Sequence, residues 1–177
     1  TAGHIRQVQK LYENQSGRKI SLPYGVEALR CYGGVKLQKK TEEASERTEG
    51  AQVLNMEGDT IWENETFRTC IFPYSGEKIL EKKYTKWLDC DKINCELSVR
   101  TRRSGDYMIV NQSGGRKKLT RCMIDDKIPG EIRQEIPLVA AKDEILWIVG
   151  GRISERYKIT SQTEKVLEIT YQGGSIE

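Results

Sequence analysis

The sequence predicts an α+β fold in which short helices pack on small antiparallel or mixed sheets. Strand-like runs of about four to eight residues occur along most of the chain and are bounded by Gly and Pro turns. Apolar residues at helical spacing are confined to a few segments. Strands and helices do not alternate regularly, as they would in the βαβ units of a parallel sheet, so α+β is the favoured class.

The first part of the chain predicts one helix followed by hairpins. Apolar residues at helical spacing indicate an amphipathic helix over residues 4–14: Ile5, Val8, Leu11 and Tyr12. Turn residues at Pro23–Gly25 and Gly33–Gly34 separate three strand-like runs at 19–22, 26–32 and 35–39. Residues 40–50 contain one apolar residue, Ala44, and predict a mobile or solvated loop. Further strands are expected at 52–56, 61–62 and 65–72, and a helix could begin in 74–84.

The second part predicts a strand at 96–101, a turn at Arg102–Asp106 and a helix at 117–127 that ends before Pro129-Gly130. Strands are expected at 136–140, 144–149 and 166–170. The apolar run Leu146–Val149 is typical of a strand buried on both faces. A change of composition near residues 90–94 suggests two subdomains. One is an N-terminal α+β subdomain at 1–92, with the helix, the hairpins and the charged loop, and the other is a basic C-terminal α+β subdomain at 93–177.

The totals describe a chain of 177 residues that can bury a core as one large or two small domains. It contains no apolar run long enough to span a bilayer and no signal-peptide pattern. The five cysteines are odd in number and scattered, which favours a reducing, cytoplasmic compartment over a disulfide framework. None forms a CxxC pair, so zinc is not expected.

No catalytic or metal-binding set emerges from the residues. His4 is the single histidine and lies near a terminus, which disfavours Ser-His-Asp and Cys-His chemistry. The acid pairs Asp89/Asp91 and Asp125/Asp126 lack a third ligand at suitable spacing, so turn and helix-end roles are expected for them.

The positive charge is concentrated between Arg100 and Arg133. This stretch holds nine Lys/Arg against four Asp/Glu, a net charge of +5, whereas the whole chain carries +3. Residues 1–99 balance at 15 against 15, and residues 134–177 sum to −2. A basic field with Gly-rich turns suits a polyanion such as nucleic acid, although a solvated charged face without a partner remains the alternative.

Local context refines this expectation. If Gly114-Gly115 opens a helix, the free N–H groups of its first turn beside Arg116–Lys118 suit an anion. Asp106 could orient Arg102 or Arg103 or cap the turn. Core packing is preferred for Trp62, Trp87 and Trp147, whereas Tyr107 and Tyr157, which neighbour arginines, are candidates for partner contact.

Four segments, taken in order, resemble the C-terminal region of bacterial tRNA(Ile)-lysidine synthetase: SGRKISLPYGVEALRCYGGVKL (16–37), SVRTRRSGDYM (98–108), GGRKKLTRCMIDDKIPGEIRQEIPLVA (114–140) and EILWIVGGRISERYKIT (144–160). The resemblance implies an enzyme that uses ATP with Mg, and lysine, to modify the wobble cytidine of an isoleucine tRNA. It places this chemistry in an N-terminal adenylating domain with an S-G-G-x-D-S loop, which Ser113-Gly114-Gly115-Arg116 does not match. The region in hand would then be a non-catalytic part that holds the tRNA on its acceptor-stem side. Its second half would be similar to a module of the phenylalanyl-tRNA synthetase β-subunit.

Where the motifs match, the resemblance and the charge together nominate tRNA-facing residues. These are Arg100, Arg102, Arg103, Arg116, Lys117, Lys118, Lys127, Arg133 and Arg152. The resemblance implies a second partner, the enzyme's own N-terminal catalytic domain. Two alternatives stay open: a domain that docks on that catalytic domain without touching RNA, and a free-standing enzyme acting on a phosphorylated small molecule.

Overall fold

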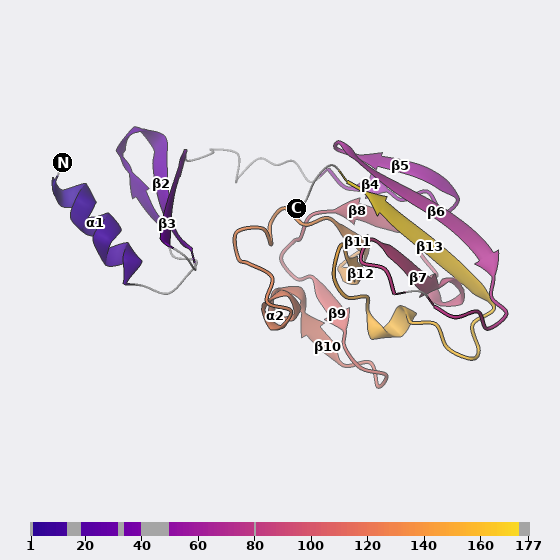
Figure 1. The fold of residues 1–177 in the computed structure, drawn as a ribbon. Coiled ribbons are helices and arrows are strands. Elements are labelled where there is room, and N and C mark those ends of the chain that lie inside the picture. Colours follow the sequence, from indigo (N-terminus) through magenta and orange to yellow (C-terminus); the bar gives the residue numbers. More distant parts are fainter. Residues whose placement is uncertain (1, 14–18, 32–33, 40–49, 80, 174–177) are drawn as a thin grey trace. The chain divides into compact units, whose positions relative to one another are not determined.

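The computed structural model describes residues 2–13, 19–31, 34–39, 50–79 and 81–173 (Figure 1). Contacts divide the chain into two compact units, Thr1–Thr48 (unit 1) and Glu49–Glu177 (unit 2). The division does not fall at the boundary expected between residues 92 and 93, because both sheets of unit 2 join strands from either side of that point.

Unit 1 is a helix with a three-stranded antiparallel sheet. Helix α1 spans Ala2–Tyr12, and the sheet order is β1-β2-β3, with β1 at Lys19–Leu22, β2 at Val26–Cys31 and β3 at Gly34–Lys39. Leu11 of the helix and Ala28 of β2 are its buried apolar residues among those described. These elements confirm the predicted helix and hairpins, while the expected loop at 40–49 lies outside the described residues.

Unit 2 contains two sheets built from residues far apart in the sequence. The first has the order β10-β9-β12-β11-β8-β4. Its strands are β4 (Gln52–Val53), β8 (Ser98–Arg100), β9 (Tyr107–Ile109), β10 (Arg116–Lys118), β11 (Leu138–Ala141) and β12 (Glu144–Ile148). The second has the order β5-β6-β13-β7, with β5 at Gly58–Trp62, β6 at Glu65–Pro73, β7 at Thr85–Asp89 and β13 at Lys165–Gln172.

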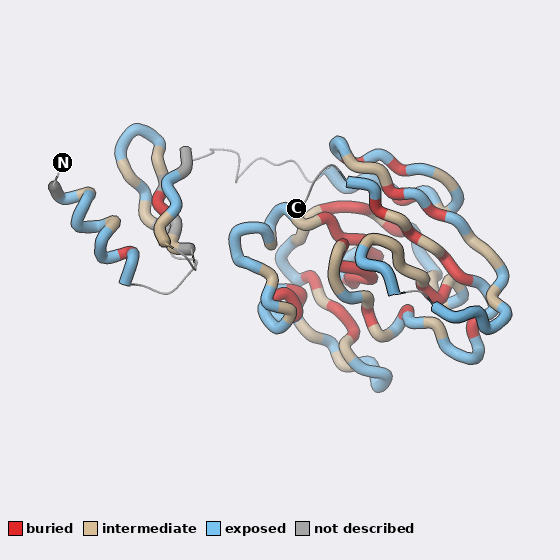
Figure 2. Tube along the Cα trace, viewed as in Figure 1, coloured by how far each residue is buried: buried red, intermediate tan, exposed pale blue. Residues whose placement is uncertain are grey.

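The main core lies between the two sheets. Its buried residues come from both of them, including Phe67 and Leu167 of one sheet and Val139 and Trp147 of the other. Figure 2 shows these buried positions recurring along the strands. Because side chains alternate between the two faces of a strand, Leu138 and Ala140 leave this core and enter a second one.

The second core lies on the opposite face of the six-stranded sheet, under helix α2 (Leu119–Asp125). Leu119, Cys122 and Met123 supply its helical side, and Met108 and Ile145 lie on the sheet side. Unit 2 therefore has three layers, in the order four-stranded sheet, six-stranded sheet and helix α2. This arrangement confirms the α+β class. The expected similarity to the phenylalanyl-tRNA synthetase module stays a prediction.

A β-bulge accounts for the continuous apolar run in β12. Val139 pairs with Trp147 and Ala140 with Ile145, so Leu146 is an extra residue on β12. Leu146 and Trp147 both enter the main core, while Ile145 and Ile148 enter the core under α2. As the run predicted, the strand is buried on both faces.

Two predicted helices differ from the structure. Residues 74–84 form no helix in their described part. The helix expected at 117–127 begins only at Leu119, because Arg116–Lys118 pair with β9 as strand β10. The helical spacing of apolar residues also starts at Leu119, whereas 74–84 lacks an apolar face to bury.

No helix in the described part of the chain is long and apolar enough to cross a membrane.

Replacing Trp147 tests the main core. Trp147→Ala should lower the free energy of unfolding by about 3–5 kcal/mol, because this fully buried ring fills space between the sheets. Trp147→Phe should cost less, since the indole N–H has no hydrogen-bond acceptor among the described residues. Urea unfolding of the two variants measures the difference. An alanine variant within about 0.5 kcal/mol of the parent, as at a surface site, would contradict the placement.

Candidate nucleic-acid interface

A buried ion pair lies at the beginning of the basic stretch. Arg100 and Asp106 are 2% and 4% exposed. Nη1 and Nη2 of Arg100 donate to Oδ2 and Oδ1 of Asp106, each at 2.8 Å. Two parallel bonds of this kind are the strongest arrangement available to a guanidinium and a carboxylate. Arg100 was expected to face RNA, but its burial leaves no surface for that contact.

The same pair holds two turns of the backbone. Asp106 accepts the N–H of Arg103 at 2.7 Å, which is the predicted turn-capping role. Arg100 Nη2 donates to the carbonyl oxygen of Lys142 at 2.6 Å. Lys142 has φ of 55°, which L-residues rarely adopt, so this bond helps to hold a strained turn between β11 and β12. The pair thus ties the turn before β9 to the turn before β12.

Hairpin β9–β10 carries cations on one edge of the six-stranded sheet. Alternation along β10 places Arg116 and Lys118 on the same side and Lys117 on the other. The Arg116 guanidinium lies over the ring of Tyr107 at 4.5 Å from its centroid, and Lys118 pairs with Tyr107 in the strand register. Neither Arg116 nor Lys118 has an acidic partner within the part of the chain that the structure describes.

Further cations lie at the same end of the hairpin. Arg102 donates to the hydroxyl of Thr120 at 2.8 Å, and the N–H of Leu119 donates to the carbonyl of Asp106 at 2.9 Å. These bonds bring the Arg102–Asp106 turn against the start of α2, beside Lys118. Arg103 is exposed at this turn. We call Arg102, Arg103, Arg116 and Lys118 the hairpin surface.

Other cations of the stretch are neutralised by acids at the end of α2. Lys117 and Arg121 pair with Asp125, and Arg152 pairs with Asp126, the C-cap residue of the helix. The hydrogen bond from Lys117 lowers the pKa of Asp125. The hydrogen bond to Asp126 raises the pKa of Arg152. The expected helix-end role of the two acids is confirmed, and it reduces the net field of Lys117 and Arg152.

The two remaining nominated residues lie beyond α2. Lys127 is exposed, and Arg133 donates its Nε to the carbonyl oxygen of Ile128 at 2.8 Å. The nominated residues therefore have different surroundings in the structure. Four make the hairpin surface, one is buried, two are paired with acids and two lie beyond the helix.

A small basic pocket adjoins the hairpin surface. It has a volume of about 430 Å³. Its lining residues are Lys92, Asn94, Cys95, Tyr107, Arg116, Ala141, Lys142, Asp143, Glu144, Arg156 and Tyr157, and we call it the Lys142 pocket. Sequence reasoning missed Lys92, Lys142 and Arg156, because each is an isolated cation outside the dense stretch. Tyr157, a candidate for partner contact, is only 5% exposed and packs in the main core.

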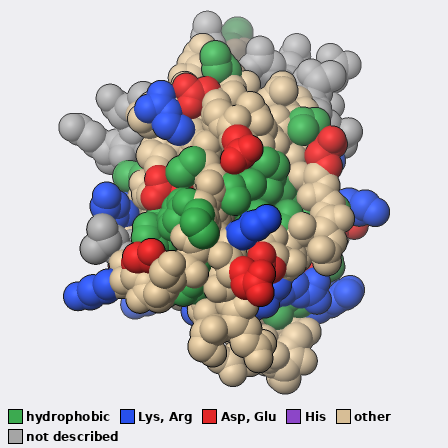
Figure 3. All heavy atoms as spheres, turned by 90° about the vertical axis from the view of Figure 1, so that its right-hand side faces the viewer, with side chains coloured by type: hydrophobic (Ala, Val, Ile, Leu, Met, Phe, Trp, Pro, Cys, Tyr) green, Lys and Arg blue, Asp and Glu red, His purple; other side chains and the backbone are tan. Residues whose placement is uncertain are grey.

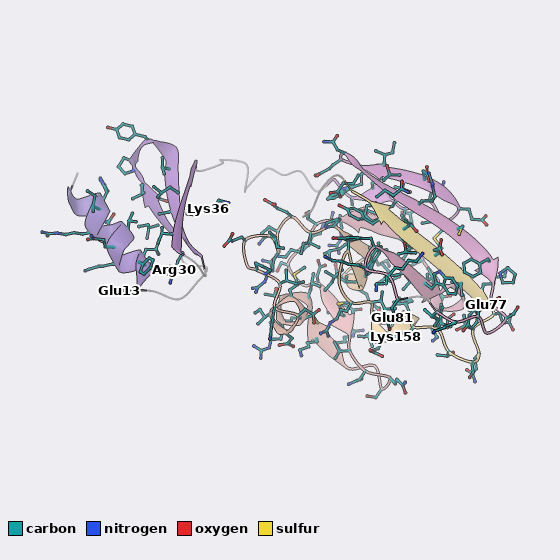
Figure 4. All side chains as sticks on the ribbon, in the orientation of Figure 1. Glu13, Arg30, Lys36, Glu77, Glu81 and Lys158 are labelled. Atoms are coloured by element: carbon teal, nitrogen blue, oxygen red, sulfur yellow. The ribbon has the colours of Figure 1, made fainter. Side chains whose placement is uncertain are left out.

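A larger groove of about 1060 Å³ lies elsewhere on unit 2. Its lining is largely apolar, with Ile79, Trp87, Ile128 and Ile132 among it, and it carries both signs of charge. Figure 4 labels two of its charged lining residues, Glu81 and Lys158. Figure 3 shows a face on which hydrophobic side chains gather at the centre, bordered by acidic and basic ones, so that face is not uniformly basic.

Within the described ranges, no group of three or more His, Cys, Asp or Glu side chains could hold a metal ion. Asp89 and Asp91 have the expected turn and helix-end roles. Asp89 caps the 3-10 helix Cys90–Lys92, and Asp91 accepts the N–H groups of Glu164 and Lys165.

Comparison with known proteins shows which proteins the region resembles. Residues 97–169 match the family described as the TilS substrate C-terminal domain. The tRNA(Ile)-lysidine synthase of Caldanaerobacter subterraneus subsp. tengcongensis is 38% identical over 171 residues, a match that covers 96% of this chain. The chain is a relative of the tRNA(Ile)-lysidine synthases. The enzyme of Clostridium tetani is 32% identical over 173 residues, again with 96% of this chain covered.

The match places the chain in the C-terminal part of these lysidine synthases. The chain spans 36% and 37% of the two relatives. A crystal structure of a TilS C-terminal domain superposes with a TM-score of 0.58 at 26% identity. The superposition covers 71% of this chain and 97% of that domain.

Asp106 tests the buried ion pair. Asp106→Ala should destabilise unit 2 by about 3–5 kcal/mol, because it leaves the Arg100 guanidinium buried without its counter-ion. The double variant Arg100→Met/Asp106→Leu should recover only part of this, since it removes the partners of the Arg103 N–H and the Lys142 carbonyl. Thermal and urea unfolding measure both.

Asp59→Ala is a matched control, because Asp59 forms a similar two-bond pair with Arg68 at the surface, where the side chains are 46% and 59% exposed. A solvated pair contributes little, so this variant should unfold almost as the parent does. Equal losses for Asp59→Ala and Asp106→Ala would show that burial does not set the strength of the Arg100–Asp106 pair.

Proposed function

We propose that this chain is the tRNA-holding C-terminal part of a tRNA(Ile)-lysidine synthase. The observation that carries the proposal is the hairpin surface. Its cations lie within the segment that matches the TilS C-terminal domain, and none has an acidic partner among the described residues. Unpaired cations gathered on a fixed hairpin are the arrangement that binds a phosphate backbone.

The mechanism is electrostatic capture with recognition of shape. The major groove of an A-form stem is too deep and narrow for side chains, so contacts fall on phosphates, 2′-hydroxyls and the shallow minor groove. Arg116 is held against the ring of Tyr107, which reduces the freedom that the guanidinium loses when it binds. Such contacts give affinity and position, and they leave the choice of the modified base to another part of the protein.

The chemistry belongs to the rest of a longer protein. The named relatives are tRNA(Ile)-lysidine synthases, and this chain spans about a third of their length. We propose that an N-terminal domain supplies the reaction with ATP, Mg and lysine in the cytoplasm. The present region would hold the acceptor-stem side of an isoleucine tRNA. Holding the tRNA body raises its effective concentration at a distant active site and lowers the entropic barrier there.

A second candidate function is docking on the protein's own catalytic domain without RNA contact. The large groove favours it, because an apolar lining with charges of both signs resembles a protein–protein interface more than a nucleic-acid site. The two functions are compatible in one chain, since the groove and the hairpin surface have no residue in common.

Salt dependence of tRNA binding separates the two functions. The chain should bind an isoleucine tRNA with an affinity that falls steeply between low and physiological salt, because bound cations displace condensed counter-ions. Fluorescence anisotropy across a salt series measures the slope. Little affinity for tRNA at any salt concentration would favour the docking function instead.

Removing the hairpin cations should weaken this binding without unfolding the protein. Arg116→Ala/Lys118→Ala should reduce the salt slope by about two, one for each lost phosphate contact. The melting temperature should stay nearly unchanged, because both side chains are exposed. Lys78→Ala/Lys165→Ala is the control, since it removes the same charge from exposed positions outside both the groove and the Lys142 pocket. An equal loss of tRNA affinity in the two double variants would mean that binding depends on the total charge and not on where the cations lie.

A further inference from the structure

The Lys142 pocket has the walls of a small ligand site. Residues from four separate segments line it. These are the 3-10 helix Cys90–Lys92 with the residues after it, hairpin β9–β10, the turn between β11 and β12, and the 3-10 helix Glu155–Tyr157. Its volume of about 430 Å³ is in the lower part of the range of small-molecule sites. A site of this size accepts one chemical group rather than the width of an RNA stem.

Cations outnumber acids in the lining by four to two. The cations are Lys92, Arg116, Lys142 and Arg156, and the acids are Asp143 and Glu144. Arg156 donates to Glu144 at 2.8 Å, and Lys92 lies 3.1 Å from a carboxylate oxygen of Asp89. These pairs neutralise Glu144 and use two of the four cations.

Arg116 and Lys142 are the cations left over. In the described residues neither side chain has an ion-pair partner, and the contact recorded for Arg116 is the face of Tyr107. The guanidinium of Arg116 has five N–H donors, and within the described residues it donates no hydrogen bond. Two unpaired cations at one pocket repel each other, and an anion between them removes that repulsion.

The backbone around Lys142 is fixed in advance. Its φ of 55° is strained, and the buried Arg100 holds its carbonyl oxygen. The neighbouring carbonyl of Asp143 accepts the N–H of Tyr107 at 3.0 Å. The turn that carries Lys142 is thereby joined to the strand that carries the ring under Arg116.

We infer that the Lys142 pocket binds one phosphate group, with Arg116 and Lys142 as its donors. The inference rests on the proposed function, because it takes the phosphate to belong to the RNA that the hairpin surface holds. Two sources share this chemistry: a terminal phosphate monoester and an internal phosphodiester. A monoester has more charge and one more free oxygen than a diester.

Cys95 offers a direct readout of the pocket. It is an exposed free cysteine in the lining, whereas Cys70 is an exposed free cysteine on β6 outside it. Alkylation of each, followed by site-resolved mass spectrometry, reports pocket occupancy with an internal control. The probes are an RNA hairpin with a 5′-monophosphate and the same hairpin with a 5′-hydroxyl. Anisotropy measures the binding of both RNAs in parallel.

The expected result is that the 5′-phosphorylated hairpin slows the alkylation of Cys95 and leaves that of Cys70 unchanged. Lys142→Asn should weaken binding of this RNA about tenfold, as for loss of a charged hydrogen bond. Asparagine tolerates positive φ, so this variant removes the charge while the turn is retained. Lys142→Arg should restore affinity, and Lys165→Asn should behave as the parent chain.

Each outcome decides a different point. If Lys142→Asn weakens only the phosphorylated hairpin, the bound group is the terminal monoester. If both RNA hairpins slow the alkylation of Cys95, and Lys142→Asn weakens the binding of both equally, the bound group is an internal diester. If both RNAs bind while Cys95 stays unprotected and Lys142→Asn binds as the parent does, the pocket inference is wrong and the proposed function stands. If neither RNA binds, the proposed function fails and the inference fails with it.

Discussion

The buried pair of Arg100 and Asp106 is the interaction on which the organisation of unit 2 depends. Two charges removed from water are favourable only when their geometry and hydrogen bonds are nearly complete, and here they are. The remaining donors and acceptors of the pair bind main-chain groups of Arg103 and Lys142. One ion pair therefore sets the position of two loops that are far apart in the sequence. The cations that we propose for RNA are carried by those loops and by the hairpin between them.

Placement, more than number, determines what the positive charge of this chain can do. Asp125 and Asp126 at the end of α2 form ion pairs with Lys117, Arg121 and Arg152. These pairs neutralise much of the positive charge at this end of the helix. The hairpin surface and the Lys142 pocket retain theirs. The dense basic stretch thus separates into cations that are paired with acids and cations that have no acidic partner among the described residues.

Local patterns in the sequence predicted the strands well and the functional geometry less well. Alternating or continuous apolar residues revealed β6, β12 and β13, because burial acts on each strand directly. Strands β9 and β10 have three residues each, too few for a period to show, and β9 pairs with β12 through a contact more than thirty residues away in the sequence. Arg100 was assigned to the surface because a count of charges does not reveal that Asp106 forms a buried ion pair with it. Lys142 was missed because it is distant from Arg116 in the sequence. The two residues line the same pocket only as a result of the strand order β10-β9-β12-β11.

Strand β10 forms one edge of the six-stranded sheet, and the other edge, β4, has only two residues. An open edge can pair with the edge of a second molecule, and lysine on such a strand is a common protection against this. The sequence Arg116-Lys117-Lys118 therefore has a second consequence for the protein. Like charges on two approaching copies repel, so this strand also discourages the sheets of two molecules from pairing edge to edge.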